Sequence, residues 1–193
     1  MSSVNLDKFV EDATRTESIP DVVMVDHELL EGVMALSICV GEMMDKLKKN
    51  IFYGKHFTIE EFNSLSRDAT NANELIHEVT MKSKLNKREL AVDPRVLHSI
   101  MGIFTESSEL IEALDVHLFE ETALDAVNLK EEFGDLLWYQ AIGVDATKMD
   151  YADVFNTVIA KLKTRYPDKF TSDHAINRDL VKERNVLEKK GKK

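Results

Sequence analysis

The sequence predicts an all-α fold, and three observations support this prediction. Apolar residues recur with the 3.6-residue period of amphipathic helices along most of the 193 residues. No segment shows the sustained alternation of apolar and polar residues that is typical of a half-buried strand. The chain contains only seven Gly and three Pro, and 44% of its residues are hydrophobic, which favours a folded helical protein over a disordered one.

The N-terminal half predicts two helices. The first runs from about residue 26 to residue 49 and ends in the segment NIFYGK, where Gly54 favours a turn. The second begins near Thr58, because Thr58 and Glu61 have the spacing of a capping box. We expect this second helix to continue through a polar middle section to about Leu85.

The C-terminal half predicts three further helices and, after them, a charged C-terminal helix. Asp93 followed by Pro94 is a strong helix start, since it places an acid at the N-cap and proline at the first helical position. We expect the next helix to open near Thr122, and another to be capped by Asp150 and stopped by Pro167. The helix after Pro94 carries a 3.6-period apolar stripe, formed by Leu97, Ile100, Met101, Phe104, Ile111, Leu114 and Leu118.

Three segments organise the chain: an N-terminal helical segment (1–92), a helical core (93–175), and a charged C-terminal helix and tail (176–193). The N-terminal segment resembles the core internally. LLEGVMALSICVGEMMDKLKKNIF aligns without a gap on VLHSIMGIFTESSELIEALDVHLF, although Cys39 then stands where the core has Glu106. Because two amphipathic helices often align by chance, a degenerate copy and a chance similarity both remain open.

Composition excludes several classes of protein. The net charge is −10, from 35 acidic and 25 basic residues, so we expect no nucleic-acid partner. The single cysteine, Cys39, excludes an internal disulfide and fits a reducing compartment. No stretch approaches the ~20 apolar residues that span a bilayer, and the N-terminus lacks the features of a secretory signal. We therefore expect a cytoplasmic protein with no membrane partner.

Four carboxylates are the candidate metal ligands. Glu106 and Glu109 lie three residues apart on one predicted helix, and Glu132 and Asp135 lie three apart on the next. Residues with this spacing share a helix face, so two packed helices can bring all four together. Oxygen ligands without His or Cys favour hard cations, Mg²⁺ first and Mn²⁺ second.

The same spacing also fits a solvated surface. It recurs elsewhere in this acidic chain, at Glu28/Glu31, Glu42/Asp45 and Glu109/Glu112. On a helical wheel Glu106 lies opposite its apolar stripe, which predicts an exposed side chain. Asp135 instead lies in FGDLLWYQAIGV, which is apolar on nearly every side and predicts a buried helix. A buried carboxylate needs a partner, and this argues for a functional role of Asp135.

Three strings carry a family resemblance: LHSIMGIFTESSELIEAL, VNLKEEFGDLLWYQAI and KLKTRYPDKFTSDHAINRDLVKERNVLE. From about Val96 to Glu188 the chain resembles the MazG-like all-α nucleoside triphosphate pyrophosphohydrolases, and most of all the small single-domain members common in bacteriophages. The signature of this family is E-x-x-E, a spacer and E-x-x-D. The resemblance implies a four-helix-type bundle over 93–175, to which this chain adds an N-terminal helical segment.

What the resemblance implies about chemistry is Mg²⁺-dependent hydrolysis of a nucleoside triphosphate to a monophosphate and pyrophosphate. Glu106, Glu109, Glu132 and Asp135 would hold the metal, and Glu106 or Glu109 would also act as the general base. By the same resemblance Tyr139 contacts the substrate, while Lys161 and Arg165 meet its phosphates.

The chain departs from the family in one segment. Relatives carry KK…FYGK just after the first acidic helix, whereas here KLKKNIFYGK stands in the N-terminal half. Two interpretations follow. Lys48, Lys49 or Lys55 contributes to a phosphate pocket, or the N-terminal half packs only as a scaffold.

Two functions from different classes remain open. One is the hydrolase, serving nucleotide pool control or the removal of non-standard nucleotides. The other is a catalytically silent oligomerisation or regulatory module that kept the fold. The long apolar stripes of the helices and the habit of the family both predict a homo-oligomer, a dimer or a tetramer.

Overall fold

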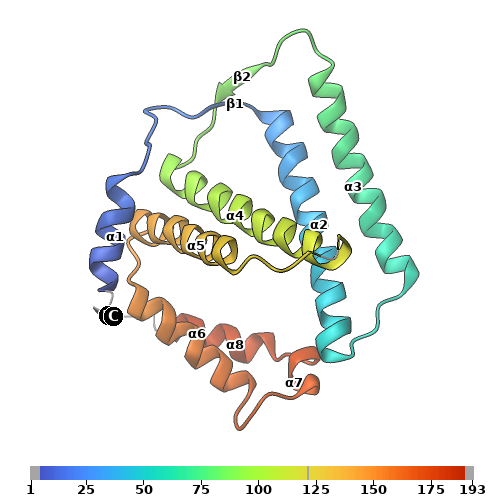
Figure 1. Cartoon of the computed structure of the whole chain (residues 1–193), viewed down its shortest axis with the longest axis vertical. Coiled ribbons are helices and arrows are strands. Elements are labelled where there is room, and N and C mark those ends of the chain that lie inside the picture. The colour runs from blue at the N-terminus through green and yellow to red at the C-terminus, as the bar shows by residue number, and fades with distance from the viewer. Residues whose placement is uncertain (1–4, 121, 190–193) are drawn as a thin grey trace. The chain divides into compact units, whose positions relative to one another are not determined.

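The computed structural model describes residues 5–120 and 122–189 and confirms the all-α prediction (Figure 1). Strands within these residues are confined to one two-stranded ribbon. No helix in the described part of the chain is long and apolar enough to cross a membrane. In chain order the elements are α1 (Leu6–Arg15), β1 (Met24–Asp26), α2 (His27–Tyr53), α3 (Ile59–Thr80), β2 (Lys87–Glu89), α4 (Pro94–Phe119), α5 (Ala126–Ala146), α6 (Tyr151–Arg165), α7 (Ser172–Ile176) and α8 (Leu180–Lys189).

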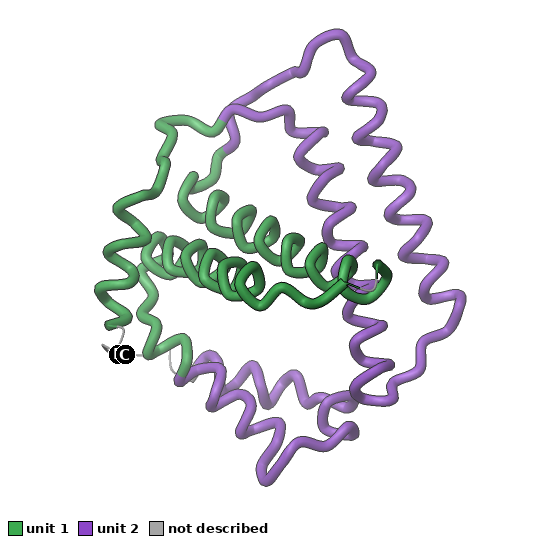
Figure 2. Tube along the Cα trace, viewed as in Figure 1, with its two compact units in different colours: residues 1–23, 91–155 green, residues 24–90, 156–193 purple. Residues whose placement is uncertain are grey.

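The chain divides into two compact units (Figure 2). The first consists of residues 1–23 and 91–155, and the second of residues 24–90 and 156–193. Each unit thus combines two separate stretches of the sequence, since α1 packs on α5 in the first unit and α7 packs on α2 in the second. The three-part organisation expected from the sequence stays a prediction.

Helices α4 and α5 form an antiparallel hairpin in the first unit, and small residues let them approach closely. The ring of Tyr139 lies directly over Gly102, where an added Cβ would come 2.1 Å from the ring. One turn away, a Cβ on Gly143 would come 2.3 Å from the hydroxyl of Ser99. That hydroxyl donates to the carbonyl of Tyr139 at 2.7 Å, so a polar contact ties the two helices at their crossing.

Helix α1 covers one side of α5. Ala13 is fully buried with Ile142, and Phe9 packs edge-on against Trp138 with ring centroids 5.7 Å apart. Arg95 at the start of α4 strengthens this packing, because it donates to the buried carboxylate of Glu17 at 2.8 Å.

Helices α2 and α3 form a second antiparallel hairpin, in the second unit. A Cβ on Gly32 would come 2.8 Å from Ile76, which marks the close approach of these helices. The predicted capping box is confirmed: Glu61 donates its backbone N–H to the Thr58 hydroxyl at 3.1 Å, and its carboxylate accepts from the Thr58 backbone at 2.8 Å. Gly54 ends α2 with a positive φ of 69°, as a left-handed cap requires.

The C-terminal helices of the second unit are held by a buried ion pair. Glu183 on α8 accepts two hydrogen bonds from Arg165, at 2.8 and 2.7 Å, and two from Arg178, at 3.3 and 2.6 Å. Hydrogen bonds from these arginines lower the pKa of Glu183 to about 2. The carboxylate is therefore ionised throughout the physiological pH range.

Several helix boundaries differ from the prediction. Helix α1 was not expected, α3 ends at Thr80 rather than near Leu85, and α5 begins after Asp125 rather than at Thr122. Asp125 is the N-cap instead, because its carboxylate accepts hydrogen bonds from the backbone N–H groups of Val127 and Asn128. The expected single C-terminal helix is two helices, α7 and α8, separated at 177–179.

The two hairpins repeat each other at a constant spacing of 67 residues. Helix α4 begins at 94 where α2 begins at 27, and α5 begins at 126 where α3 begins at 59. Their ends agree within one residue, and the caps Asp26 and Thr58 correspond to Asp93 and Asp125. The close contact also repeats, since Gly32 and Ile76 occupy the places of Ser99 and Gly143. This spacing is that of the gap-free alignment, although a common origin of the two hairpins stays a prediction.

Candidate metal centre

The α4–α5 hairpin brings three of the four predicted metal ligands together. Glu106, Glu109 and Glu132 each have a carboxylate oxygen that lies within 4.8 Å of the other two. Glu106 and Glu109 are on neighbouring turns of α4, and Glu132 faces them from α5. Two of these side chains are buried, with exposed fractions of 9% for Glu106 and 5% for Glu132.

Nothing among the described residues neutralises this cluster. No Lys, Arg or His in the described part of the chain lies within ion-pair distance of Glu106, Glu109 or Glu132. The partner of Glu132 is an uncharged amide, since Asn128 donates to its carboxylate at 2.7 Å. Burying carboxylates without a cation is costly, so the donor set fits an added hard cation.

The pKa values of the cluster shift as mutual repulsion predicts. The nearby carboxylate of Glu132 raises the pKa of Glu109, and loss of solvation adds to the effect. Loss of solvation raises the pKa of Glu132, and the charge of Glu106 raises it further. A divalent cation between them would reverse both shifts by favouring the ionised forms.

Burial at two of the predicted ligands is the reverse of what the helical wheel indicated. Glu106 was expected to be exposed and is buried, because α5 packs on the face of α4 that carries Ser99, Gly102 and Glu106, while the apolar stripe of α4 is left exposed. Asp135 was expected in a helix buried on all sides and is exposed, as are its neighbours Phe133 and Leu137. Helices α4 and α1 together cover only part of α5, so apolar residues such as Phe133 and Leu137 face outward.

Asp135 lies beside the cluster rather than in it. It is one turn beyond Glu132 on α5, and its charge contributes a smaller part of the raised pKa of Glu109. The three glutamates therefore form the centre of the site, with Asp135 within electrostatic reach of it.

A pocket of about 330 Å³ opens beside the cluster, at the loop end of the hairpin. Acids dominate its lining: Glu109, Glu112, Asp125 and Glu132 contribute carboxylates, and no basic side chain of the described residues lines it. Sequence reasoning overlooked Asn128, which holds Glu132 in place. Its position four residues before Glu132, on the same helix face, was the available signal.

Tyr139 is half-buried between the helices. Its ring packs over Gly102 and meets His98 edge-on, with centroids 5.5 Å apart. The substrate contact expected of Tyr139 stays a prediction, since this packing fixes the ring but does not itself identify a ligand.

The two predicted phosphate-binding cations lie on α6, in the second unit. Lys161 is half-buried and forms no ion pair within the described ranges, whereas Arg165 is engaged with Glu183. The hydrogen bonds to Glu183 further raise the pKa of Arg165, so its positive charge is permanent. Their role toward phosphate stays a prediction.

Comparison with known proteins identifies the segment that carries this site. Residues 97–170 match the family model of the MazG nucleotide pyrophosphohydrolase domain. No curated protein and no solved structure matches the chain. The matched segment includes the glutamate cluster and Asp135, and it leaves the α2–α3 hairpin outside. Residues 97–170 are therefore similar to the MazG nucleotide pyrophosphohydrolase domain, and they lie in a chain whose described residues are mostly helical.

Proposed function

We propose that this protein hydrolyses nucleoside triphosphates, ribo- or deoxyribo-, to a nucleoside monophosphate and pyrophosphate in a reaction that depends on Mg²⁺. The observation that carries the proposal is the cluster of Glu106, Glu109 and Glu132, two of them buried and none neutralised by a described cation, inside the matched MazG segment. The MazG family indicates nucleotide pyrophosphohydrolase activity, and the carboxylate donors favour Mg²⁺, with Mn²⁺ as a substitute.

The carboxylates would divide the work between them. Glu132, Glu106 and Glu109 would hold the metal, with Asp135 joining from the adjacent turn. A bound Mg²⁺ would offset the charge of the triphosphate and lower the pKa of the attacking water. Glu109 is exposed at the edge of the pocket and has a raised pKa, so it or Glu106 would orient that water and accept its proton.

The proposed substrate contacts rest on the family resemblance alone. Tyr139 is the proposed contact for the nucleoside, and Lys161 and Arg165 are the proposed cations for the phosphates. The pocket beside the cluster has four carboxylates along its lining, so a bound metal would be the first group there to offset the charge of a triphosphate. The role would be nucleotide pool control or the removal of non-standard nucleotides, as in the small phage-type members that the sequence resembles.

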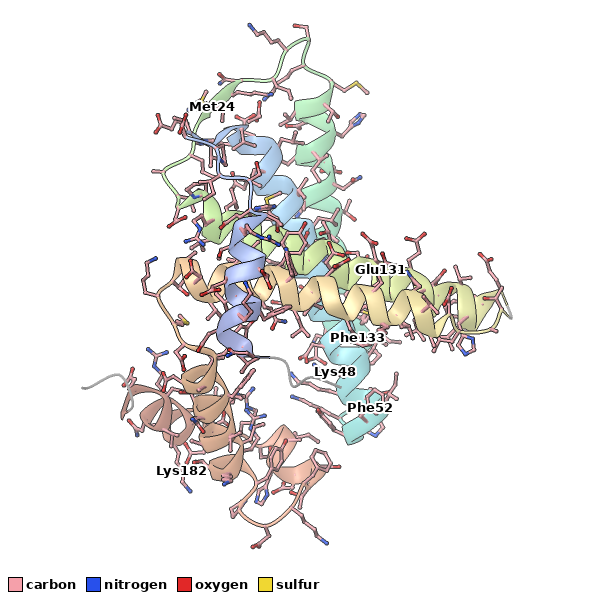
Figure 3. All side chains as sticks on the ribbon, turned by 60° about the vertical axis from the view of Figure 1, so that its left-hand side comes forward. Met24, Lys48, Phe52, Glu131, Phe133 and Lys182 are labelled. Carbon is pink, nitrogen blue, oxygen red and sulfur yellow. The ribbon has the colours of Figure 1, made fainter. Side chains whose placement is uncertain are left out.

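Self-association is part of the proposal. Helix α4 exposes Phe104, Ile111, Leu114 and Leu118 at helical spacing. Helix α2 does the same, and Phe52, labelled in Figure 3 near its C-terminal end, is 69% exposed. Apolar helix faces of this size favour a homo-oligomer, a dimer or a tetramer. We expect no nucleic-acid partner given the net charge of −10, and a cytoplasmic location given the single, unpaired cysteine.

A pyrophosphate-release assay tests the hydrolase directly. The full chain is incubated with the common ribo- and deoxyribonucleoside triphosphates, with Mg²⁺, with Mn²⁺ and with EDTA. Turnover that requires the metal supports the proposal. Absence of turnover on every triphosphate in the presence of metal would favour the second candidate, a silent oligomerisation module, which the exposed apolar helices also support. Sedimentation of the same sample gives the oligomeric state.

Replacing one carboxylate tests the site. Asp135→Asn keeps the size of the side chain and removes its charge, so a metal ligand would lose activity. Near wild-type turnover in this variant would count against Asp135 as a ligand and would leave the three glutamates as the metal site.

A further inference from the structure

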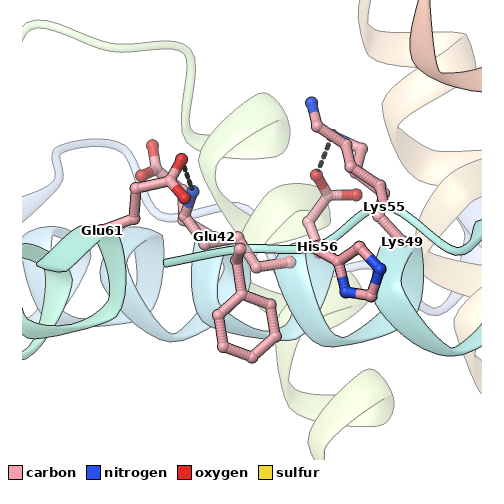
Figure 4. Close-up of a pocket in the computed structure, with 8 residues that line it drawn as sticks. Glu42, Lys49, Lys55, His56 and Glu61 are labelled. Atoms are coloured by element: carbon pink, nitrogen blue, oxygen red, sulfur yellow. Dashed lines mark hydrogen bonds and ion pairs between the residues drawn. The ribbon is translucent and has the colours of Figure 1, made fainter. Parts of the chain in front are cut away.

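The α2–α3 hairpin has a pocket that corresponds to the one beside the metal cluster. It lies at the loop end of the hairpin and has a volume of about 280 Å³ (Figure 4). All but one of the residues that line it stand 67 positions before a residue that lines the acidic pocket, the exception being Phe57. Two acids are kept, since Glu42 corresponds to Glu109 and Asp45 to Glu112. The two pockets therefore occupy the same place in equivalent hairpins.

The buried acids of the metal site are absent from this hairpin. Cys39 stands in the place of Glu106 and Leu65 in the place of Glu132. Both are buried, each with an exposed fraction of 8%, as the two glutamates are. The hairpin thus keeps the burial pattern of the metal site and replaces its two buried carboxylates with side chains that do not bind Mg²⁺.

Cationic and imidazole groups replace neutral residues around the same pocket. Four positions change in this way: Lys46, Lys49, Lys55 and His56 stand where the other hairpin has Ala113, Val116, Thr122 and Ala123. The acidic pocket has four carboxylates and no basic residue among its described lining, a formal charge of −4. The other pocket has three carboxylates and three lysines, a formal charge of zero without His56.

The positive charges gather at one end of this pocket. Figure 4 shows Lys49, Lys55 and His56 together there, with Glu42 and Glu61 at the other end. Lys46 is paired with Glu61 at 3.2 Å, while Lys49 shares the single carboxylate of Asp45 with Lys48. Among the described residues, Lys55 and His56 have no acidic partner within ion-pair distance. This end of the pocket therefore carries positive charge that its own acids do not balance.

The backbone supports an anion at the same end. Gly54 has a left-handed φ, which turns the chain out of α2 and brings Lys55 and His56 to the pocket. Helix α3 begins a few residues later, and its capping box of Thr58 and Glu61 already occupies its N-terminus, so it offers the anion no free site. Two features, the cationic side chains that Asp45 alone does not balance and the turn at Gly54, therefore meet at one end of the pocket.

From these features we infer that the α2–α3 hairpin binds a phosphate-bearing anion without a metal, in the pocket that corresponds to the metal site of the α4–α5 hairpin. The ligand class is free pyrophosphate or phosphate, or the phosphate chain of a nucleotide. The sequence did not decide whether Lys48, Lys49 and Lys55 bind phosphate or only form part of a scaffold. On this inference Lys49 and Lys55 contact the anion, whereas Lys48 does not line the pocket and makes no contact with it. This inference does not rest on hydrolysis by the MazG segment.

Isothermal titration calorimetry of the full chain in EDTA tests the inference, since it requires neither metal nor turnover. Pyrophosphate, phosphate and a nucleoside triphosphate are titrated separately. We expect binding of pyrophosphate, and a loss of at least about tenfold in affinity in the Lys49→Gln, Lys55→Gln double variant, because charged hydrogen bonds to the anion are removed. The matched control Lys48→Gln removes a neighbouring lysine outside the pocket and is expected to stay within about twofold.

Comparison of the three ligands identifies the source of the anion, and comparison of the variants shows whether the inference fails. Equal affinities for pyrophosphate and triphosphate identify the phosphate chain as the ligand, and a tighter triphosphate identifies a nucleotide. No binding heat at millimolar ligand overturns the inference. So does an equal loss in Lys48→Gln, which indicates diffuse charge, or a gain in affinity in Glu132→Gln, which places the anion in the acidic pocket, where the Glu132 carboxylate repels it. Failure of the hydrolase proposal leaves these results unchanged.

Discussion

The two hairpins share one frame and differ in chemistry. At the four positions that correspond to the predicted metal ligands, burial is the same in both. Glu106 and Cys39 are buried, as are Glu132 and Leu65, while Glu109, Glu42, Asp135 and Asp68 are exposed. Packing geometry therefore decides which positions are buried, and it does so whether the residue is a carboxylate or an apolar group. A hairpin that buries two acids at such positions has a free-energy cost near neutral pH that a bound cation removes.

The largest expected effect separates the two hairpins by activity. Glu132→Gln removes a buried carboxylate of the proposed metal site, so we expect turnover to fall by more than about 100-fold, the upper figure for groups that merely support metal ligands. The matched control is Asp68→Asn in the other hairpin, at the position that corresponds to Asp135, and it is expected to retain activity within about twofold. Pyrophosphate release under saturating Mg²⁺ measures both. Equal losses in the two variants would end the distinction between the hairpins.

A second prediction places a carboxylate where the α2–α3 hairpin has an apolar side chain. Leu65→Glu buries a charge in the α2–α3 hairpin, where Glu42 and Asp68 are present but Cys39 replaces the second buried acid of the proposed cation site. We expect the free energy of unfolding to fall by about 3 kcal/mol or more, from the lost apolar contact and the unpaired charge. Urea denaturation with and without Mg²⁺ measures the loss. Full recovery in Mg²⁺ would show that this hairpin can still assemble a metal site, contrary to our expectation.

Helix packing offers a third comparison, of smaller size. Gly102→Ala would drive a Cβ into the ring of Tyr139, so we expect a loss of about 1–3 kcal/mol in the free energy of unfolding. Gly41→Ala in α2 meets open space and is expected to stabilise the chain by about 0.5–1 kcal/mol, because alanine favours the helix. Thermal denaturation of both variants checks the two signs. A stable Gly102→Ala variant would mean that Tyr139 moves easily from the helix crossing.

The smallest expected effect is a difference in pH dependence in EDTA. The folded state raises the pKa of Glu132, so its charge destabilises the metal-free protein near neutrality, and this cost disappears as the pH falls toward the usual value of 4.5. Glu132→Gln should therefore melt at a higher temperature than wild type at pH 7, and this difference in melting temperature should be smaller at pH 5.

Asp45 in the other hairpin provides the contrast. Hydrogen bonds from Lys48 and then Lys49 lower the pKa of Asp45 below its usual 3.8. Its contribution to stability is complete above that value, so the gap between wild type and Asp45→Asn should stay constant from pH 7 to pH 5. A narrowing gap for both variants would remove the contrast.

Local signals in the sequence were sufficient to predict most of the helices. Asp93-Pro94 and the Thr58–Glu61 capping box start the helices where predicted, because each depends on backbone groups a few residues away. Helix α1 was overlooked although it carries the same kind of signal. Asn5 caps it by accepting from two backbone N–H groups, and Phe9 and Ala13 lie four residues apart on its packed face.

The environment of the site could not be predicted in the same way. Whether Glu106 or Asp135 is buried depends on which face of each helix the partner helix covers, and the apolar stripe of a single helix does not fix that choice. The glutamate cluster was predictable as a set of spacings, whereas its burial and the tie between Asn128 and Glu132 depend on contacts between α4 and α5 or on local side-chain geometry. The spacing of the acids left a metal site and a solvated surface both open, and the family resemblance favoured the metal site.

The constant spacing of the hairpins also bears on the history of the chain. The α2–α3 hairpin lacks a complete set of four acids only at Cys39 and Leu65, since Glu42 and Asp68 remain in place. If both hairpins descend from one ancestor, two substitutions were enough to retire one catalytic centre, and no insertion has accumulated between the paired helices since then. Homologues that retain both acids at these two positions would record the stage before that loss.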